Sequence, residues 1–234
     1  ISIDPQGRVH TFCCAVPGAW HVMGVTQGAG LSLKWFRDNF CQAEKDTAAG
    51  MGVDPYVLMD QEAGQSPIGC NRLLYLPYLM GERTPHLDPD CRGVFFGLSA
   101  MHTKRDLLRA VMEGVTYSQR DSVEILRGMG VELREMLACG GGGTSPLWRQ
   151  MLADTYNCPV KTVKSKEGPA LGVAILAGVG VGLYPSVQEA CQAMIQLNPA
   201  QEPIPENVPQ YEAFYQVYKS LYPALKENYK LLAA

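Results

Sequence analysis

The chain has 234 residues, of which 47% are hydrophobic and 18% charged, and its formal net charge is −3. A chain of this length and composition forms one large or two small globular domains with a substantial core. The charges form no basic block, and no apolar run approaches the roughly 18 residues that span a bilayer, which argues against nucleic acid and membranes as partners. We expect a cytoplasmic protein that binds small molecules.

Cysteine and histidine patterns predict neither a metal site nor a catalytic residue. The eight cysteines include no C-x-x-C pair, and none has a histidine at metal-ligand spacing. The four histidines show no triad arrangement. The first residue, Ile1, is not an initiator methionine and leads almost at once into a strand-like run, so we expect a further segment upstream.

The first part of the chain predicts a hairpin followed by a helix. Two β-rich runs at 8–15 and 20–26 flank a Val-Pro-Gly-Ala turn, which indicates antiparallel strands. The glycine-containing sequence 28–30 then opens a segment with apolar residues at helical spacing that continues to about Phe40. The segment 45–66 is polar, with a local helix start at an Asp-Pro pair.

Strands and helices alternate through the middle of the chain. A strand is predicted over 73–78, followed by a polar loop over 81–93. A capping box at 103–106 begins a long helix with a mostly apolar stripe that reaches about Arg127, and a strand over 132–139 follows it.

The next segment contains four consecutive glycines, 140–143, which predict a tight loop. Ser145-Pro146 then starts a helix, and a short strand over 159–163 follows. A helix of small residues over 170–177 is expected to pack closely against neighbouring backbone. This order of elements predicts an α/β fold.

The end of the chain predicts a connector and an amphipathic helix. The sequence 201–209 contains three prolines and is expected to be extended. Tyrosines then recur near helical spacing, which is typical of a docking face: Tyr211, Tyr215, Tyr218 and Tyr222.

The glycine run 140–143 is the first chemical signal. Consecutive glycines after a strand let backbone N–H groups approach a ligand without a Cβ in the way, and the next helix offers a positive amino-terminal end. Such a site suits phosphate or a flat base with its ribose, although glycine-rich turns also serve purely as connections. A P-loop is excluded because no Gly-Lys-Ser/Thr follows, and no βαβ unit with a downstream acid indicates a dinucleotide site.

Several segments resemble the FGGY family of carbohydrate kinases. The sequence Gly-Val-Phe-Phe-Gly-Leu at 93–98, with Asp106-Leu107 and Ala-Val-Met-Glu at 110–113, is similar to the second signature of that family. The sequence Leu-Pro-Tyr-Leu-Met-Gly-Glu-Arg-Thr-Pro-His at 76–86 resembles the corresponding loop of its xylulokinase branch. The resemblance continues through the glycine run to the final helix and covers essentially the whole chain.

This resemblance implies a ribonuclease-H-like domain of the actin, sugar kinase and Hsp70 superfold, C-terminal in its parent protein and incomplete at its N-terminal edge. Residues 1–202 are then the nucleotide-binding domain, and 203–234 are the connector and helix that pack on it. The implied activity is transfer of the γ-phosphate of ATP, with Mg²⁺, to a ketopentose such as D-xylulose. An N-terminal domain of the same kinase is expected to supply most sugar contacts.

The resemblance also implies nucleotide contacts along the cleft, at Gly30, Lys34, Gly140, Gly141, Gly142, Gly143 and Thr144. Glu82 and Arg83 lie in a loop that is expected to face the cleft, where a guanidinium holds phosphate. The alternative for this pair is a salt-bridged loop anchor. Asp106 and Glu113 belong to the signature but fit helix capping and packing better than chemistry.

The family's catalytic carboxylate, in an Asp-containing glycine motif, accepts the proton of the attacking sugar hydroxyl. Neither that motif nor the Gly-Thr-Ser/Thr turn that contacts the terminal phosphates occurs in this sequence. We therefore predict no turnover by the chain alone. The alternatives are a kinase of another sugar or polyol, a noncatalytic nucleotide-binding or interaction module, and a homodimer that pairs exposed sheet edges.

Overall fold

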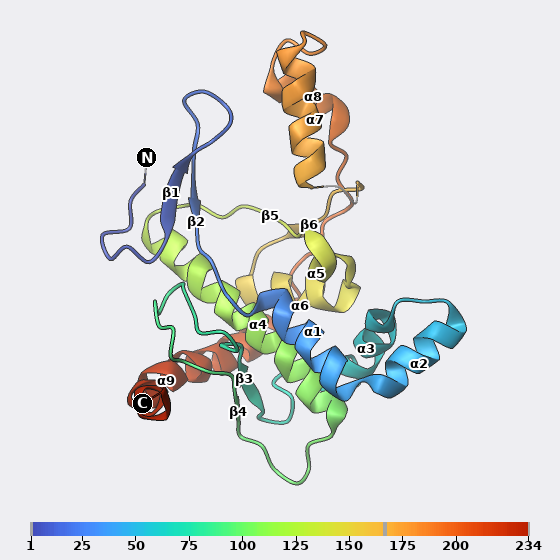
Figure 1. Cartoon of the computed structure of the whole chain (residues 1–234), viewed down its shortest axis with the longest axis vertical. Helices are drawn as coiled ribbons and strands as arrows, with labels where there is room; N and C mark the ends of the chain where they lie inside the picture. Colours follow the sequence, from blue (N-terminus) through green and yellow to red (C-terminus); the bar gives the residue numbers. More distant parts are fainter. Residues whose placement is uncertain (1, 166–167, 234) are drawn as a thin grey trace.

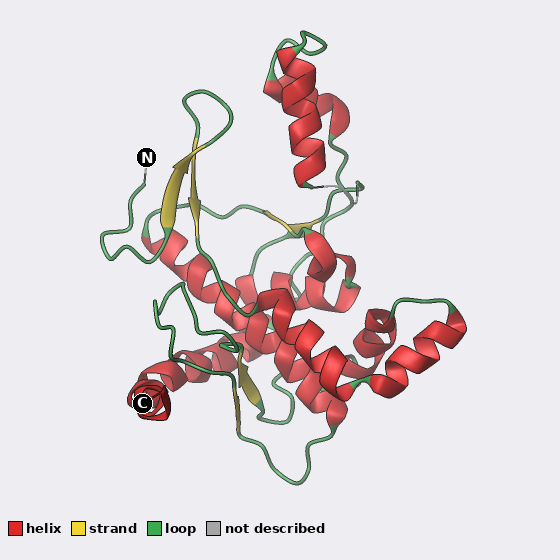
Figure 2. Ribbon diagram, viewed as in Figure 1, coloured by secondary structure: helices red, strands yellow, loops and turns green. Residues whose placement is uncertain are grey.

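A computed structural model describes residues 2–165 and 168–233, and strands and helices alternate along the chain (Figures 1 and 2). The described strands form three two-stranded sheets. Strands β1 (His10–Cys13) and β2 (Trp20–Met23) form the predicted antiparallel hairpin. Strands β3 (Leu74–Leu76) and β4 (Val94–Phe96) are also antiparallel, whereas β5 (Met136–Leu137) and β6 (Val160–Lys161) are parallel.

Most predicted helices are present. The described helices are α1 (Ala29–Phe40), α2 (Gln42–Met51), α3 (Pro55–Ala63), α4 (Lys104–Gly128), α5 (Gly140–Thr144), α6 (Pro146–Tyr156), α7 (Pro169–Gly180), α8 (Val187–Met194) and α9 (Val208–Ala233). Helices α2 and α8 and strand β4 were not predicted from the sequence. The order of the elements confirms the α/β prediction.

The glycine run was predicted as a tight loop, and that prediction is wrong, because 140–144 form the short helix α5. Gly140 has a φ of +72°, which turns the chain away from the preceding strand. The following residues then wind into a helical turn, and the Thr144 hydroxyl donates a 2.7 Å hydrogen bond to the Gly141 carbonyl oxygen. A local backbone turn therefore overrides the poor helix propensity of glycine.

Helix α4 occupies the centre of the molecule (Figure 1) and packs against β3, α1, α6 and α3. It begins at the predicted capping box, in which the Asp106 carboxylate accepts a 2.8 Å hydrogen bond from the Thr103 backbone N–H. Gly114 lies at the crossing with β3, where a Cβ would be only 2.1 Å from the Tyr75 carbonyl oxygen. The helix and the strand are therefore in direct backbone contact.

A buried ion pair joins α4 to its neighbours. The Glu113 carboxylate accepts hydrogen bonds from Arg109 Nε at 2.7 Å and from the Gly69 backbone N–H at 3.1 Å. Arg109 also donates to the Ser66 carbonyl oxygen and to the Tyr211 hydroxyl of α9. Each buried charge thus has several partners, which a stable core requires. The packing role expected for Glu113 is what the structure shows.

The tyrosines of α9 form the predicted docking face. Tyr211, Tyr215, Tyr218 and Tyr222 are all buried. Their hydroxyl groups also find partners in the core, since Tyr215 donates to the Asp121 carboxylate at 2.7 Å and Tyr222 donates to the Asp88 carboxylate at 2.7 Å.

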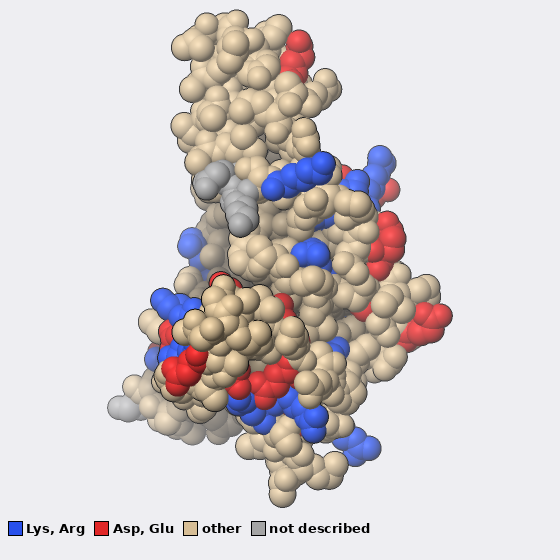
Figure 3. Space-filling model, turned by 90° about the vertical axis from the view of Figure 1, so that its right-hand side faces the viewer, with Lys and Arg blue, Asp and Glu red and all other residues tan. Residues whose placement is uncertain are grey.

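Helices α7 and α8 form a pair that projects from the rest of the molecule (Figure 1). The predicted close packing of α7 is wrong for most of the helix, because its buried residues are Ile175 and Gly178. The sequence 168–198 contains one charged residue, Glu189, and this part of the surface is almost free of charge at the top of Figure 3. Within 2–165 and 168–233 no helix is long and apolar enough to cross a membrane.

The contact at Gly114 generates a stability prediction. We expect Gly114→Ala to lower the free energy of unfolding by about 1–3 kcal/mol, because the new methyl group overlaps the Tyr75 carbonyl and must push α4 from β3. Gly128→Ala is the matched control, since it lies in the same helix with no atom within 4 Å of its Cβ position and gains up to about 1 kcal/mol of helix propensity. Urea unfolding measures both, and equal stability of the two variants contradicts the prediction.

Candidate functional site

Two cavities adjoin each other along a shared wall. Gly30, Gly141, Gly142 and Trp148 line both of them. The first cavity, of about 630 Å³, lies between β2, α4 and β5. The second, of about 730 Å³, lies between α1, α3 and the start of α6. Each volume falls in the usual range for small-molecule sites.

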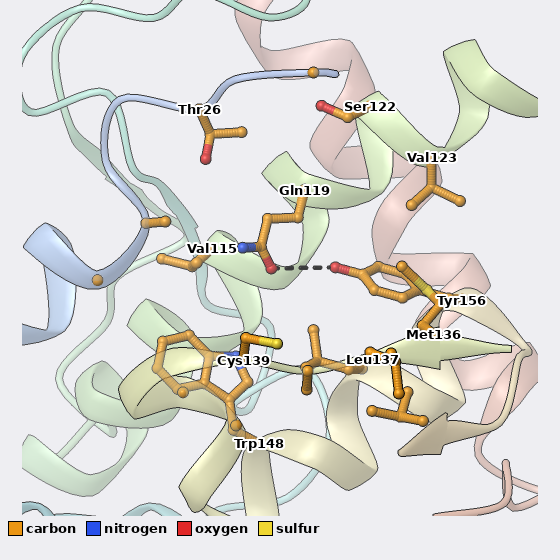
Figure 4. A pocket seen from close by; sticks show the side chains of 18 of the residues that line it. Thr26, Val115, Gln119, Ser122, Val123, Met136, Leu137, Cys139, Trp148 and Tyr156 are labelled. Atoms are coloured by element: carbon orange, nitrogen blue, oxygen red, sulfur yellow. Dashed lines mark hydrogen bonds between the residues drawn. The ribbon is translucent and has the colours of Figure 1, made fainter. Parts of the chain in front are cut away.

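The first cavity is mostly apolar, with a few polar groups that point inward (Figure 4). Helix α4 contributes Val115, Gln119 and Ser122 to its wall. The Tyr156 hydroxyl donates to Gln119 Oε1 at 3.2 Å. Within the described part of the chain, the buried Ser122 hydroxyl has no hydrogen-bond partner. The cavity therefore offers an apolar surface with a small number of polar contacts.

Aromatic and acidic side chains line the second cavity. Tyr56 and Asp60 come from α3, one helical turn apart, and Leu33 comes from α1. Burial raises the pKa of the Asp60 carboxyl, and a hydrogen bond from the Ser145 side chain partly offsets that effect. The cavity thus combines flat rings with a partly desolvated acid.

Trp148, in the shared wall, is held from two sides. Its indole Nε1 donates a 2.9 Å hydrogen bond to the Thr116 hydroxyl of α4. Its backbone N–H donates to Ser145 Oγ at 3.0 Å, which is the N-cap contact of α6. Because Thr116 in turn donates to the Met112 carbonyl oxygen, the ring is fixed to the central helix.

Two glycines of the run have structural reasons to be glycine. Gly140 has a φ of +72°, a conformation that other residues rarely adopt. At Gly143 a Cβ would lie 2.8 Å from the Ala138 carbonyl oxygen. The fold itself therefore requires both.

Gly30 and Gly141 have no such reason. Neither has a positive φ, and no heavy atom outside the local helix lies within 4 Å of the Cβ position. A glycine inside a helix costs roughly 1 kcal/mol relative to alanine. At these two positions the backbone is instead left open toward the cavities, which suits the close approach of a ligand.

The structure brings most of the predicted nucleotide contacts to these cavities. Gly143 lines the first cavity and Thr144 the second, beside the residues of the shared wall. Gly140 is at the entry to α5 and lines neither cavity. Lys34 lies on the exposed side of α1, one turn beyond Gly30, and also lines neither cavity.

Glu82 and Arg83 are separated from the cavities. Glu82 is buried, and its carboxylate accepts hydrogen bonds from the backbone N–H groups of Gln27 and Arg83, each at 2.8 Å, and from the Ser118 hydroxyl at 3.2 Å. Burial raises the pKa of this carboxyl. These hydrogen bonds connect the loop to α4 and to the chain before α1. They favour the loop-anchor interpretation, with hydrogen bonds in place of the expected salt bridge. Arg83 itself is exposed.

Three residues that line the cavities were not predicted as site residues from the sequence: Tyr56, Asp60 and Trp148. The Asp-Pro pair at 54–55 predicted the start of α3 but not the direction in which that helix faces. A usable signal was the four-residue spacing of Tyr56 and Asp60, which places them on one face of a helix. For Trp148, the N-cap Ser145 three residues earlier fixed its place in the first turn of α6.

Comparison with known proteins identifies the class as carbohydrate kinases. The model of the FGGY family of carbohydrate kinases, C-terminal domain, matches residues 2–181. The chain therefore belongs to the FGGY family, and the resemblance seen in the sequence is confirmed.

Individual relatives agree with this assignment. The xylulose kinase of Staphylococcus epidermidis is 41% identical over 222 residues, which cover 95% of this chain and 43% of that protein. The gluconokinase of Bacillus subtilis is 33% identical over 232 residues, 98% of this chain and 45% of the relative. The chain thus spans less than half the length of these relatives.

Solved structures show the same fold. The crystal structure of ligand-bound xylulose kinase from Lactobacillus acidophilus superposes with a TM-score of 0.85 at 28% identity, covering 99% of this chain and 45% of that chain. The predicted superfold of actin, sugar kinases and Hsp70 is therefore confirmed.

The anchoring of Trp148 generates a second prediction. We expect Thr116→Val to lower the free energy of unfolding by about 1–3 kcal/mol, because the indole N–H loses its acceptor while it stays buried. Thr116→Ser keeps the hydroxyl and is expected to lose less. Urea unfolding compares the two variants, and a larger loss in Thr116→Ser contradicts this role of the hydroxyl.

Proposed function

We propose that this chain forms the nucleotide-binding half of a kinase that transfers the γ-phosphate of ATP to D-xylulose, giving D-xylulose 5-phosphate. The observation that carries the proposal is the open backbone of Gly30 and Gly141 where the two cavities meet. Neither packing nor backbone conformation explains these glycines, whereas a nucleotide lying against them does.

The proposed nucleotide contacts follow from this geometry. The base lies in the second cavity, against the rings of Tyr56 and Trp148, and the ribose lies against the glycines of the shared wall. Gly143 and Thr144 flank that wall, and Gly140 shapes the turn that positions it. Lys34, exposed on α1, is proposed at the mouth of the cleft as a cation for the nucleotide phosphates.

Mg²⁺ is proposed to arrive with the nucleotide. Kinases of this family use ATP, typically with Mg²⁺. Mg²⁺ in such sites is held by substrate phosphates and one or two carboxylates rather than by a dedicated protein cage. The residues at 2–165 and 168–233 contain no cluster of three or more His, Cys, Asp or Glu side chains suited to a metal ion. When bound, the ion neutralises charge on the phosphates.

Turnover is proposed to require a further, N-terminal domain of the kinase, which binds the sugar and supplies the catalytic carboxylate. Phosphoryl transfer depends mainly on positioning and on charge stabilisation, so one side of the cleft does not suffice. D-xylulose is preferred as substrate because the xylulose kinase relative is more similar than the gluconokinase. Phosphorylation of gluconate or of another sugar is the alternative. A cytoplasmic location fits a kinase that consumes ATP.

The apolar α7–α8 pair is proposed to contact another part of the kinase. Val173, Val181 and Leu183 are 66%, 82% and 70% exposed, which is unusual for residues of this type. Residues 1–202 and 203–234 are proposed to act as one domain, since α9 packs on α4, α6 and β3. A homodimer that pairs exposed sheet edges is the alternative, and sedimentation that shows a monomer at all concentrations removes it.

Calorimetric titration with MgADP tests the proposed nucleotide site. We expect the parent chain to bind MgADP and Gly142→Val to bind at least about tenfold more weakly, because its side chain enters the shared wall beside Trp148. Gly50→Val is the control, since it introduces the same residue on exposed α2 with no atom within 4 Å. If the folded parent does not bind MgADP, or if Gly142→Val binds as well as Gly50→Val, the placement of the nucleotide is wrong.

A further inference from the structure

Among residues 2–165 and 168–233, neither an ion pair nor a helix cap accounts for the position of the Asp60 side chain in the second cavity. It follows Tyr56 by one helical turn and lines the cavity with Trp148 and Ser145, which belong to a distant part of the chain. The other acid at this cavity, Asp54, is the N-cap of α3 and accepts a 2.9 Å hydrogen bond from the Tyr56 backbone N–H. Of the two acids, only Asp54 caps a helix.

The hydrogen bonds around Asp60 leave most of its acceptor capacity toward the cavity. Ser145 Oγ accepts from the Trp148 backbone N–H, so the serine hydroxyl proton is available to Asp60. An ionised carboxylate has about four acceptor positions and no donor. The Ser145 side chain lies beside this carboxyl at the cavity, where hydrogen bonding to it lowers the pKa of Asp60. A ligand that fills the cavity can therefore satisfy the Asp60 carboxylate by donating N–H groups to it.

We propose that Asp60 selects the base of the nucleotide, by accepting a hydrogen bond from the 6-amino group of an adenine held against Tyr56 and Trp148. This inference rests on the proposed nucleotide site and adds its specificity. A 6-oxopurine turns a carbonyl oxygen toward the same carboxylate, so two acceptors face each other and neither is satisfied.

The environment of Asp60 strengthens this discrimination. Its carboxyl is partly desolvated, as the burial-driven rise in its pKa shows. Hydrogen bonds to a charged group are stronger than neutral ones, and the cost of an unpaired group grows as water is excluded. The apolar and aromatic side chains of Leu33 and Tyr56 contact any purine equally well. Discrimination between purines therefore depends on the hydrogen bonds that the polar edge of the base makes.

The test compares MgADP with MgIDP, which carries a 6-oxo group, by calorimetric titration of the 234-residue chain. We expect the parent to prefer MgADP by about tenfold or more. Asp60→Asn is expected to reduce this preference below about threefold, because its amide both accepts from a 6-amino group and donates to a 6-oxo group. The gain should appear mainly as tighter binding of MgIDP.

Asp54→Asn is the matched control. It removes the same charge from the same cavity, and asparagine caps a helix as well as aspartate does. We expect it to retain the preference for MgADP. This comparison separates a specific contact at Asp60 from a general loss of negative charge near the nucleotide.

The possible results distinguish the proposed role of Asp60 from the proposed nucleotide site itself. If the parent binds MgADP but Asp60→Asn keeps the full preference, or if Asp54→Asn loses it equally, the role of Asp60 is wrong and the nucleotide site stands. If the folded parent binds neither nucleotide, both proposals fail. Circular dichroism checks folding. Asp60→Ala provides the same test should Asp60→Asn not fold, with weaker MgADP binding and a preference for MgADP below about threefold expected.

Discussion

The backbone contact between α4 and β3 at Gly114 is the constraint on which the site depends. The Tyr75 carbonyl oxygen lies 2.1 Å from where any other residue would place its Cβ, so this close approach of helix and strand requires glycine at 114. With α4 fixed in this way, Val115 and Gln119 face the first cavity, and Thr116 reaches the indole of Trp148. Helix α4 thus supports the first cavity directly and the second through Trp148, which lines both. The family signature ends at Glu113, immediately before this packing contact.

Buried polar groups give α4 a single register. Arg109 and Glu113 are paired with each other, and each also binds a group outside the helix: Tyr211 of α9 on one side and the Gly69 backbone on the other. A rotation of the helix would leave both charges buried without partners, which is costly in a core. Apolar packing alone tolerates small rotations, whereas this network does not. It therefore holds the cavity-facing side of α4 in place.

Local signals in the sequence predicted those elements that are determined locally. The capping box at Thr103 and the N-cap at Ser145 marked the starts of α4 and α6, and both helices begin there. Helix α2 escaped prediction because Ala48 is its only buried residue, so it has no apolar stripe to detect. Strand β4 is three residues long and exists because it pairs with β3. Tertiary pairing of this kind leaves no periodic pattern in the sequence.

The candidate site shows the same division between local and tertiary information. The glycine run marked one wall from sequence alone, but Tyr56, Asp60 and Trp148 meet only because α3 and α6 both pack against α4. The run is also longer than a turn requires, since Gly140 and Gly143 satisfy the backbone and the packing. Gly141 and Gly142 remain, and Gly141, like Gly30, gives up helix stability without any gain in protein contacts. Binding of a ligand at this wall accounts for the loss of helix stability at these glycines.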